Sequence, residues 1–568
     1  MCLKFYYLSS FSLEIESDEE YAGKVDRSKL KKGGSALFVA RLDPDPECME
    51  QEKQFRDSAY SNHSPYWFNE LESHFEPFSS DRNCVPVETT SVKFSFQSCT
   101  DQPPSKDTTL NRFEGKQIDG TIILFTGGPV WAMAWASQPG NQSTQYLATS
   151  SHRTYEQTSC YSAGPEPGMI QIWSIKVDED QRACGNPEFV LGIAHDFGKI
   201  WCMEWCPSGL WEYKVTLGGL AVACSDGTVK ILKVKFPRKG RSFLRPKKTR
   251  TLISGDEDMG MCLSLSWYKG PAHKYIAGSF SSGIVCIWDV GSNSPLLNIS
   301  AEYLLPIHSW PAHCSSVSGI SFSTHHEQEF PPYCVTGGTD RTYRFWDLRD
   351  TCNPVQEVKR GMVTSVEWIP GHAVASVSHD DVYLQAHTQT LLTESGSLKS
   401  GSQPVIGQNS CAWSQSISSW LGGLAVGTAG GELVTYMMPD GSKAIDQNRS
   451  SIRRRAYVYL TELSKGDLDG CEDYTTAKNH CVLKFCNLWD TDAQDYGEQK
   501  GRVRYSEKME AEDLTWFPLC SVNRVTWNPN LGAQTLLASG TQAGLVRIDM
   551  LSSLFTSDIK ELTEKMQK

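Results

Sequence analysis

The feature that most constrains the fold is a short strand pattern that recurs seven times along the chain. Each copy is followed by a second apolar strand pattern, and each first strand is expected to end in an aromatic side chain. These aromatic residues are Trp135, Trp205, Trp267, Phe322, Trp368, Trp413 and Trp527. Because one small sheet cannot bury both of its faces alone, repeated sheets of this kind are expected to stack on one another. The sequence therefore predicts an all-β fold.

The clearest copy is Tyr333–Arg349, with the sequence YCVTGGTDRTYRFWDLR. It contains two strand patterns joined by a tight turn of small and polar residues, and it follows His313 and an alternating strand at Val317–Phe322. This order resembles one WD repeat, the four-stranded blade of a β-propeller, and it ends in the pair Trp346 and Asp347. We therefore predict a seven-bladed WD40 β-propeller with long loop insertions.

Two further patterns concern strand pairing and loops. Thr121–Phe125 is expected to pair with Leu545–Ile548, because joining both ends of the repeat region in one blade leaves no open sheet edge. Several spacings between copies exceed the roughly 40–45 residues of a compact blade, so long loops are predicted near 233–255 and at about 437–520. The fifth copy is expected to turn at His379–Asp381 and to continue as a strand at Val382–Leu384.

Three regions are predicted. Residues 1–118 contain no repeat, and aromatic clusters such as Tyr66–Phe68 alternate with charged and Pro/Ser-rich segments. We expect a partly disordered N-terminal arm with aromatic docking segments, or alternatively an arm packed on its own propeller. Residues 119–552 are expected to form the propeller. Residues 553–568 are expected to be a short helix or tail.

Two sets of polar residues in the copies could be taken for catalytic groups. They are His313, Thr336, Asp340 and Trp346 in the fourth copy, and His195 and Asp226 in the second. In a WD blade these residue types hydrogen-bond in a chain between loop and strands, and each buried donor left unpaired costs about 1–3 kcal/mol. We therefore interpret both sets as a structural blade network.

The segment Lys233–Arg250 carries nine basic residues and no acidic one. Part of it is similar to a nuclear import signal. A loop that contacts phosphates and a merely solvated loop are the alternatives. The residues concerned are Arg238, Lys239, Arg241, Arg245, Lys247, Lys248 and Arg250.

Cysteines are numerous, 19 in all, but they are spread widely and often lie in strand patterns, which favours free thiols in a reducing compartment over a disulfide scaffold. Cys471, His480, Cys481 and Cys486 form a cluster whose spacing does not match a zinc finger or a paired C-x-x-C site. We therefore predict no metal and no cofactor.

The composition limits the function classes. A formal net charge of −12 means that bulk electrostatics do not drive the chain onto nucleic acid. No run is long and apolar enough to predict a membrane-spanning helix. The phosphate-binding GxxxxGK[ST] pattern, HExxH and GxSxG do not occur in the sequence, so we predict that the protein is not an enzyme.

Several segments resemble one particular WD-repeat family. They are Gly127–Trp135, Gly168–Trp173, Gly218–Gly227 and Thr336–Arg349. Together they are similar to the WD-repeat β subunit of general transcription factor IIIC of animals, and the resemblance spans about residues 110–550.

This resemblance implies a nuclear scaffold in the complex that binds internal, B-box type promoters of transfer-RNA genes and recruits the RNA polymerase III machinery. The expected partners are the other subunits of that complex, with promoter DNA contacted through the complex, and with no membrane and no small-molecule substrate. The alternative from the residues alone is a WD-repeat propeller that reads peptides or serves as a ubiquitin-ligase substrate adaptor.

Overall fold

A computed structural model describes most of residues 46–551. Residues 1–45 and 552–568 lie outside the described part, and so do internal gaps. The gaps are 62–65, 70–74, 79–82, 99–104, 140–141, 156–165, 179–181, 208–209, 213, 238–239, 325–327, 372, 381–387, 395–402, 409, 438–454, 466–477 and 488–518. No helix among the described residues is long and apolar enough to cross a membrane.

The described residues form seven sheets, numbered here by the order of their innermost strands in the chain. The first three sheets, each given from its inner to its outer strand, are as follows. Sheet 1 is β5 (Val130–Trp135), β6 (Thr144–Ser151), β7 (Gly168–Lys176), β8 (Glu188–His195), β12 (Ser242–Pro246) and β1 (Phe75–Pro77); sheet 2 is β9 (Ile200–Trp205), β10 (Thr216–Cys224), β11 (Val229–Lys235), β13 (Arg250–Leu252) and β17 (Tyr303–Leu304); sheet 3 is β14 (Cys262–Trp267), β15 (Tyr275–Phe280), β16 (Ile284–Asp289) and β18 (His308–Pro311).

The other four sheets follow the same plan. Sheet 4 is β19 (Val317–Phe322), β20 (Tyr333–Gly338), β21 (Thr342–Asp347) and β22 (Gln356–Lys359); sheet 5 is β23 (Met362–Trp368), β24 (Val374–Asp380), β25 (Thr388–Glu394) and β26 (Gln403–Gln408); sheet 6 is β27 (Ala412–Ile417), β28 (Gly423–Thr428), β29 (Glu432–Met437), β30 (Arg455–Lys465), β31 (Cys481–Asn487) and β2 (Lys93–Ser98); sheet 7 is β32 (Val522–Trp527), β33 (Leu536–Thr541), β34 (Leu545–Met550), β4 (Thr121–Phe125) and β3 (Gly115–Ile118). The prediction of an all-β fold is confirmed.

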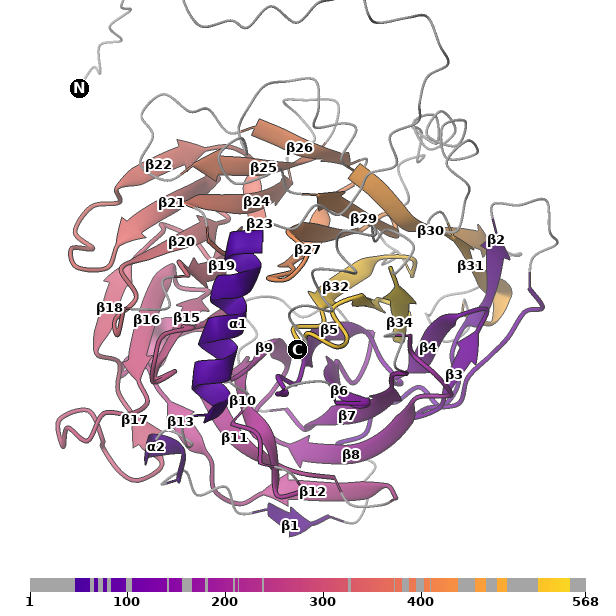
Figure 1. The fold of residues 1–568 in the computed structure, drawn as a ribbon, viewed down its shortest axis with the longest axis horizontal. Coiled ribbons are helices and arrows are strands. Elements are labelled where there is room, and N and C mark those ends of the chain that lie inside the picture. Colours follow the sequence, from indigo (N-terminus) through magenta and orange to yellow (C-terminus); the bar gives the residue numbers. More distant parts are fainter. Residues whose placement is uncertain are drawn as a thin grey trace, which may run out of the picture. The chain divides into compact units, whose positions relative to one another are not determined.

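The sheets follow one another around a common centre (Figure 1). Each innermost strand contacts the innermost strand of the next sheet, and β32 of sheet 7 contacts β5 of sheet 1. The predicted pairing of the two ends of the repeat region is present, because β4 runs antiparallel to β34 with Ile122 opposite Ile548 and Phe125 opposite Leu545. Both edges of each of these two strands are therefore hydrogen-bonded within sheet 7, which leaves neither of them as an edge strand.

A recurring hydrogen bond joins neighbouring innermost strands near their ends. The backbone N–H of the terminal aromatic residue donates to the side chain of the next-to-last residue of the preceding strand. The donor and acceptor atoms are Trp267 N to Glu204 Oε2 (2.6 Å), Phe322 N to Ser266 Oγ (3.0 Å), Trp368 N to Ser321 Oγ (2.9 Å) and Trp527 N to Ser416 Oγ (3.1 Å). Where the preceding residue is Ala134 or Thr526, the indole Nε1 of Trp205 or Trp135 donates instead to its backbone carbonyl, at 3.1 Å and 3.2 Å.

The predicted position of Trp413 at the end of its strand is wrong. β27 continues to Ile417, which lies opposite Leu424, so an aliphatic residue stands where the other six innermost strands have an aromatic one. Gln415 makes the link to sheet 5, since its side-chain N–H donates to the carbonyl of Ser376 at 2.9 Å. Trp413 belongs to β27, but it lies near the start of the strand and not at its end.

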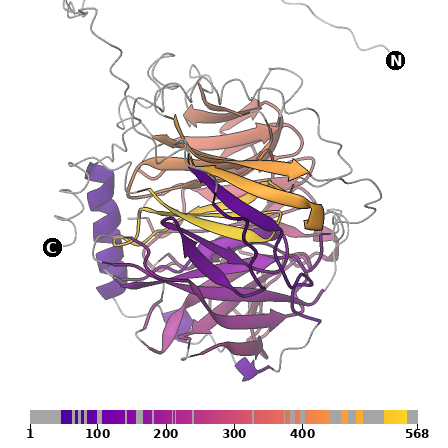
Figure 2. The same cartoon turned by 90° about the vertical axis from the view of Figure 1, so that its right-hand side faces the viewer.

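The described segments of the N-terminal arm pack on the sheets. Helix α1 (Pro46–Ser61) lies across one end of the ring (Figure 2), with Met49 fully buried in the core. In the short helix α2 (Tyr66–Asn69), the indole of Trp67 donates to the carbonyl of Ala272 at 3.0 Å. Strand β2 pairs in parallel with β31. The aromatic clusters of these segments are thus anchors within the chain, and the expectation for residues 1–45 lies outside the described residues.

A buried arginine joins the arm to sheets 6 and 7. Arg547 of β34 is fully buried and pairs with Asp549, Nη2 to Oδ1, at 2.6 Å. Its guanidinium lies over three rings, at 4.1 Å from the ring centroid of Tyr459 and 5.4 Å from those of Phe96 and Phe485. A buried charge requires such a partner and such contacts, so the enclosure favours one fixed position of β2 against both sheets.

Two predicted loops contain strands instead. The basic segment leaves sheet 2 after β11, adds β12 in parallel to β8 of sheet 1, and returns to sheet 2 as β13. The large insertion contributes β30 and β31 to sheet 6, and Ala456 and Tyr457 pair with β29 as expected of an outer strand. The short 3-10 helices Glu257–Met259 and Lys478–His480 complete the described elements.

The predicted turn at His379–Asp381 is wrong for its first two residues. β24 continues through His379 and Asp380, and the next described strand of sheet 5 is β25. The expected strand at Val382–Leu384 and the C-terminal helix lie outside the described residues.

The substitution Phe96→Ala tests whether the arm belongs to the folded domain. Phe96 is 3% exposed and stacks on Phe485 with 5.6 Å between ring centroids. Loss of a buried aromatic side chain is expected to lower the free energy of unfolding by about 3–5 kcal/mol, measured by urea denaturation. The control Val87→Ala, at a side chain 51% exposed, is expected to change it little. Equal stability of the two variants would mean that the arm is detached in solution.

Candidate functional site: the blade network, the basic segment and the central channel

The polar residues of the fourth copy meet between the loop before β19 and the turn between β20 and β21. His313 Nδ1 lies 3.0 Å from Asp340 Oδ1, and His313 Nε2 lies 2.8 Å from Thr336 Oγ1. The indole N–H of Trp346 donates to Thr336 Oγ1 at 2.8 Å. One histidine tautomer satisfies every bond, with the proton on Nδ1 and the Thr336 hydroxyl donating to Nε2.

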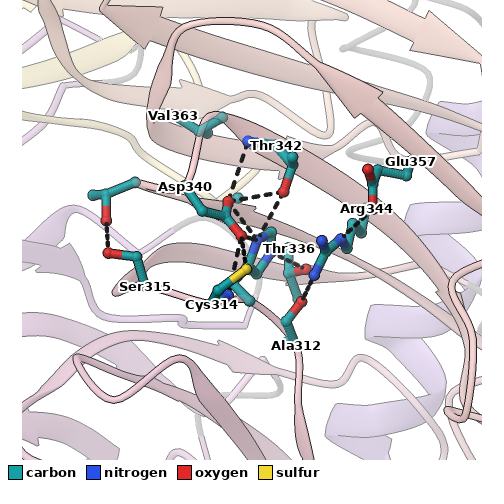
Figure 3. A network of polar contacts seen from close by, with 12 residues as sticks. Ala312, Cys314, Ser315, Thr336, Asp340, Thr342, Arg344, Glu357 and Val363 are labelled. Atoms are coloured by element: carbon teal, nitrogen blue, oxygen red, sulfur yellow. Dashed lines mark hydrogen bonds and ion pairs between the residues drawn. The ribbon is translucent and has the colours of Figure 1, made fainter. Parts of the chain in front are cut away.

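Asp340 is the acceptor that organises the turn (Figure 3). Its carboxylate accepts from the backbone N–H groups of Cys314 and Thr342, at 3.1 Å and 3.2 Å. Burial alone would raise the pKa of Asp340, but the hydrogen bonds that its carboxylate accepts from Thr342, His313 and Cys314 hold the pKa below its ordinary value. Burial lowers the pKa of His313, and the nearby Asp340 carboxylate opposes this shift. Each ring nitrogen is engaged, so the arrangement suits a structural role.

The second copy does not repeat this network. Asp226 accepts from Thr228 Oγ1 at 2.6 Å and lies 3.7 Å from Lys230 Nζ, in a turn where Gly227 has φ of 79°. His195 is the last residue of β8 in sheet 1, and its Nδ1 accepts from the backbone N–H of Phe197 at 3.3 Å. Burial lowers the pKa of His195 to about 3. Within the described part of the chain the two residues have separate partners.

Most described basic residues of the predicted import or phosphate-binding segment hold elements of the chain together. Arg241 donates to the carbonyl of Phe113 at 3.2 Å, and Arg245 lies over the ring of Phe78. Lys247 pairs with Glu76 at 2.8 Å, whereas Lys248 is exposed. Arg250 donates to the carbonyl of Ala301 at 2.8 Å. Arg238 and Lys239 lie outside the described residues, and the import and phosphate-contact roles stay predictions.

Two members of the Cys/His cluster lie on the same strand but face in opposite directions. Cys481 and Cys486 are five residues apart in β31, so their side chains point to opposite faces. Cys471 lies outside the described residues. Among the described side chains no group of three His, Cys, Asp or Glu could hold a metal ion, and the described cysteines are free thiols.

Charged residues inside the central channel were missed by the sequence analysis. The innermost strands enclose a cavity of about 280 Å³ lined by Glu204, Glu367 and Arg524 among others. Burial raises the pKa of Glu204 to about 8 and that of Glu367 to about 7, with repulsion from Glu367 adding to the first and with Arg524 and Lys269 opposing both. The available signal was a charged residue just before the terminal Trp, where other innermost strands have Ala, Ser or Thr.

Helix α1 adds charges at one end of this channel. Arg56 lines the cavity and pairs with Glu52 at 2.9 Å, and Glu52 also lies 3.5 Å from Lys269 Nζ. The guanidinium of Arg56 sits 5.4 Å from the ring of Trp420. Arg56 and Lys269 line the same cavity as Glu204, Glu367 and Arg524. Helix α1 therefore adds the Arg56–Glu52 pair to the charged residues of the channel.

An aromatic cluster lies where the innermost strands of sheets 1, 2 and 6 begin. The ring of Trp131 meets those of Trp201 and Trp413 edge to face, with 5.8 Å between centroids in both pairs. His152 lies 4.9 Å from the ring of Trp201, and burial together with the charge of Lys199 lowers the pKa of His152 to about 3. The rings contact one another directly, and the cluster is partly exposed.

The comparisons with known proteins agree with the repeat and with the family resemblance. A sequence model of the family "WD domain, G-beta repeat" matches residues 186–232 and 304–347. "General transcription factor 3C polypeptide 2" of Homo sapiens is 28% identical over 533 residues, covering 84% of this chain. "Transcription factor tau subunit sfc6" of Schizosaccharomyces pombe is 24% identical over 481 residues, covering 82% of this chain and 71% of its own length. The resemblance to a subunit of transcription factor IIIC is confirmed.

This chain spans 56% of the length of the human relative. Among solved structures, a chain of the "Crystal Structure of Mitotic Checkpoint Complex" superposes with a TM-score of 0.42 at 12% identity, covering 76% of this chain and 94% of that chain.

The substitution Thr336→Val tests the structural interpretation of the blade network. It leaves the buried indole N–H of Trp346 and the Nε2 of His313 unpaired, at a cost of about 1–3 kcal/mol each. The free energy of unfolding should fall by that order, as measured by urea denaturation. Ser315→Ala, which removes an exposed hydroxyl pair with Thr339, is the control and is expected to change stability by about 0.5 kcal/mol or less. Unchanged stability in Thr336→Val would contradict the interpretation.

Glu367 predicts a pH dependence of stability. Its folded pKa of about 7 lies above its ordinary value of 4.5, so the folded state binds the proton more tightly than the unfolded state. The resulting stabilisation is complete below pH 4.5 and is lost as the pH rises through about 7. Glu367→Gln keeps the neutral shape and should flatten this loss in thermal unfolding measured between about pH 5 and 8. The exposed control Glu188→Gln should retain the wild-type profile, and an unchanged profile in Glu367→Gln would refute the assignment.

Proposed function

We propose that this chain is a non-enzymatic scaffold of the general transcription factor IIIC complex, built as a closed seven-bladed WD40 β-propeller that docks other subunits. The observation that carries the proposal is the alignment with "General transcription factor 3C polypeptide 2", which extends over 84% of this chain. The related "Transcription factor tau subunit sfc6" supports the same assignment from a distant organism. An alignment of this extent is much longer than the two segments that match the generic repeat.

The construction of the ring supports a docking role. Neighbouring sheets are joined by hydrogen bonds at the ends of their innermost strands, so the outer strands and loops stand on a rigid base. Loops on a rigid scaffold are where binding residues are usually placed. The best-formed polar constellation, around His313, is occupied by its own internal bonds. We therefore infer that the chain functions through residues on its surface.

Promoter DNA is contacted through the complex in this proposal. A net charge of −12 disfavours bulk attraction to phosphates. Within the basic segment, Arg241 and Arg250 donate to backbone carbonyls, and Lys247 pairs with Glu76. The role of this subunit would be to hold the subunits that bind B-box type promoters of transfer-RNA genes, and its location would be the nucleus.

A second function has one observation in its favour. A WD-repeat protein that reads peptides, or that selects substrates for a ubiquitin ligase, needs an aromatic or acidic pocket at one end of the ring. The partly exposed cluster of Trp131, Trp201 and Trp413 has the required chemistry. Direct ring-to-ring packing fills the space that a captured side chain would need, which favours the scaffold function.

Affinity purification of the tagged full chain from nuclear extract, followed by mass spectrometry, tests the two functions together. The expected result is recovery of the other subunits of transcription factor IIIC in stoichiometric amounts. Thr336→Val, which weakens the fourth sheet, should reduce the yield of the whole set, whereas Ser315→Ala should not. A partner set that lacks all of these subunits and contains ubiquitin-ligase components or histones would replace the scaffold function with the peptide-reading one.

A further inference from the structure

A loop between β16 and β18 exposes an unusual amount of apolar surface. Four large side chains of this loop are open to solvent: Leu296 is 84% exposed, Ile299 61%, Tyr303 43% and Ile307 37%. They are half of the eight exposed large apolar residues found in the described part of the chain. Isolated exposed apolar residues are ordinary, but a group in one loop marks an interaction surface.

The loop is held in a defined conformation. Leu304 is fully buried in the core beneath sheets 2 and 3, and Leu297 packs against the same core. The side-chain amide of Asn298 donates to the carbonyl of Ser292 at 2.7 Å and to that of Ser294 at 3.0 Å. Apolar side chains thus alternate along the chain, with Leu297 and Leu304 turned inward and Leu296 and Tyr303 turned outward. The outward residues are presented by a fixed backbone, which lowers the entropic cost of binding.

Arg250 anchors the loop to the basic segment. Its guanidinium donates to the carbonyls of Ala301 at 2.8 Å and Ser300 at 3.2 Å, and it contacts the Asn298 side chain. Strand β17 pairs in parallel with β13, which places Tyr303 opposite Thr251. The basic segment and the apolar loop therefore form one continuous surface.

A cleft lies between these two segments. It has a volume of about 700 Å³, and its walls include Trp67, Lys248, Arg250, Asn298 and Glu302. Such a volume is enough for one or two large side chains of a partner. Lys248 is exposed at the cleft wall, and the neighbouring Lys247 is 61% exposed in its side chain while it pairs with Glu76. Leu296 and Ile299 directly follow the lining residues Pro295 and Asn298 in the chain, and Lys247 directly precedes the lining residue Lys248.

We propose that Leu296, Ile299, Tyr303 and Ile307, together with Lys247 and Lys248, dock an acidic amphipathic segment of another subunit of the complex. The apolar residues of that segment would cover the loop and enter the cleft, while its carboxylates would pair with the two lysines. Charge complementarity selects this occupant, because the carboxylates of an acidic segment are attracted to the lysines. This inference rests on the proposed scaffold function and adds the surface and the chemistry of the partner.

The test uses the full chain assembled with the other transcription factor IIIC subunits, with the dissociation constant measured by fluorescence titration. Leu296→Asp with Ile299→Asp should weaken assembly at least about tenfold, since buried apolar anchors dominate binding. The matched control Val355→Asp changes an apolar residue 54% exposed on another loop and should leave assembly unchanged. All variants should keep the thermal midpoint of the wild type, because the altered side chains are exposed.

The proposed ion pairs of Lys247 and Lys248 with the partner are tested separately. Lys247→Glu with Lys248→Glu should weaken assembly and reduce its dependence on salt, whereas Lys359→Glu, at a side chain 81% exposed elsewhere, should not. Zero-length carbodiimide coupling of the assembled complex should join Lys247 or Lys248 to an aspartate or glutamate of the partner subunit.

Three outcomes overturn the inference. Wild-type affinity in Leu296→Asp with Ile299→Asp would remove this surface from assembly while leaving the scaffold function intact. Light scattering that shows a dimer of the isolated chain, converted to a monomer by the same variant, would assign the surface to a second copy of the chain. Failure of the wild-type chain to bind any of the other subunits would overturn the scaffold function and this inference with it.

Discussion

The structure depends on hydrogen bonds that join each innermost strand to the next one. Sheets that only stack on one another would be held by non-directional apolar contacts, which do not define a rotation between neighbours. Directional hydrogen bonds fix this rotation. Examples are the bonds from Trp368 N to Ser321 Oγ and from Trp205 Nε1 to the carbonyl of Ala134. They satisfy backbone and indole N–H groups that burial would otherwise leave unpaired, at a cost of about 1–3 kcal/mol each. In six of the seven innermost strands the donor belongs to the terminal aromatic residue, either its backbone N–H or its indole N–H, and in the seventh strand Ile417 stands at that position.

Because the innermost strands are joined firmly, the outer parts of the sheets can differ from one another. The arm contributes β1 and β2 to the outer edges of sheets 1 and 6, and the basic segment crosses from sheet 2 to sheet 1 as β12. These additions cover strand edges that would otherwise be open to other chains. The apolar loop before β18 is the opposite case, since it is held firmly by Arg250 and yet leaves Leu296 and Ile299 uncovered. A surface that is fixed but uncovered fits the proposed scaffold function.

The repeat was predictable because its signal is local. Alternating residues with a terminal aromatic, such as Val317–Phe322, identify a strand without any knowledge of its neighbours. Trp413 shows the limit, since an aromatic residue near the start of a strand gives the same pattern as one at its end, and only pairing of Ile417 with Leu424 decides between them. The pairing of strand β12 is even harder to predict from the sequence. Nothing within Ser242–Pro246 indicates that it pairs with a sheet other than the one it has just left.

The amino-acid sequence by itself determined the all-β class, the recurring unit and the resemblance to transcription factor IIIC subunits, because alternation and turn chemistry operate within a few residues. The tertiary structure alone decided which charged residues share the channel and which loop faces solvent. Glu204 and Glu367 are far apart in the chain, and they line one cavity only because the innermost strands share a common centre. Lys248 and Asn298 line one cleft because β13 pairs with β17, and pairing between distant segments has no local signature.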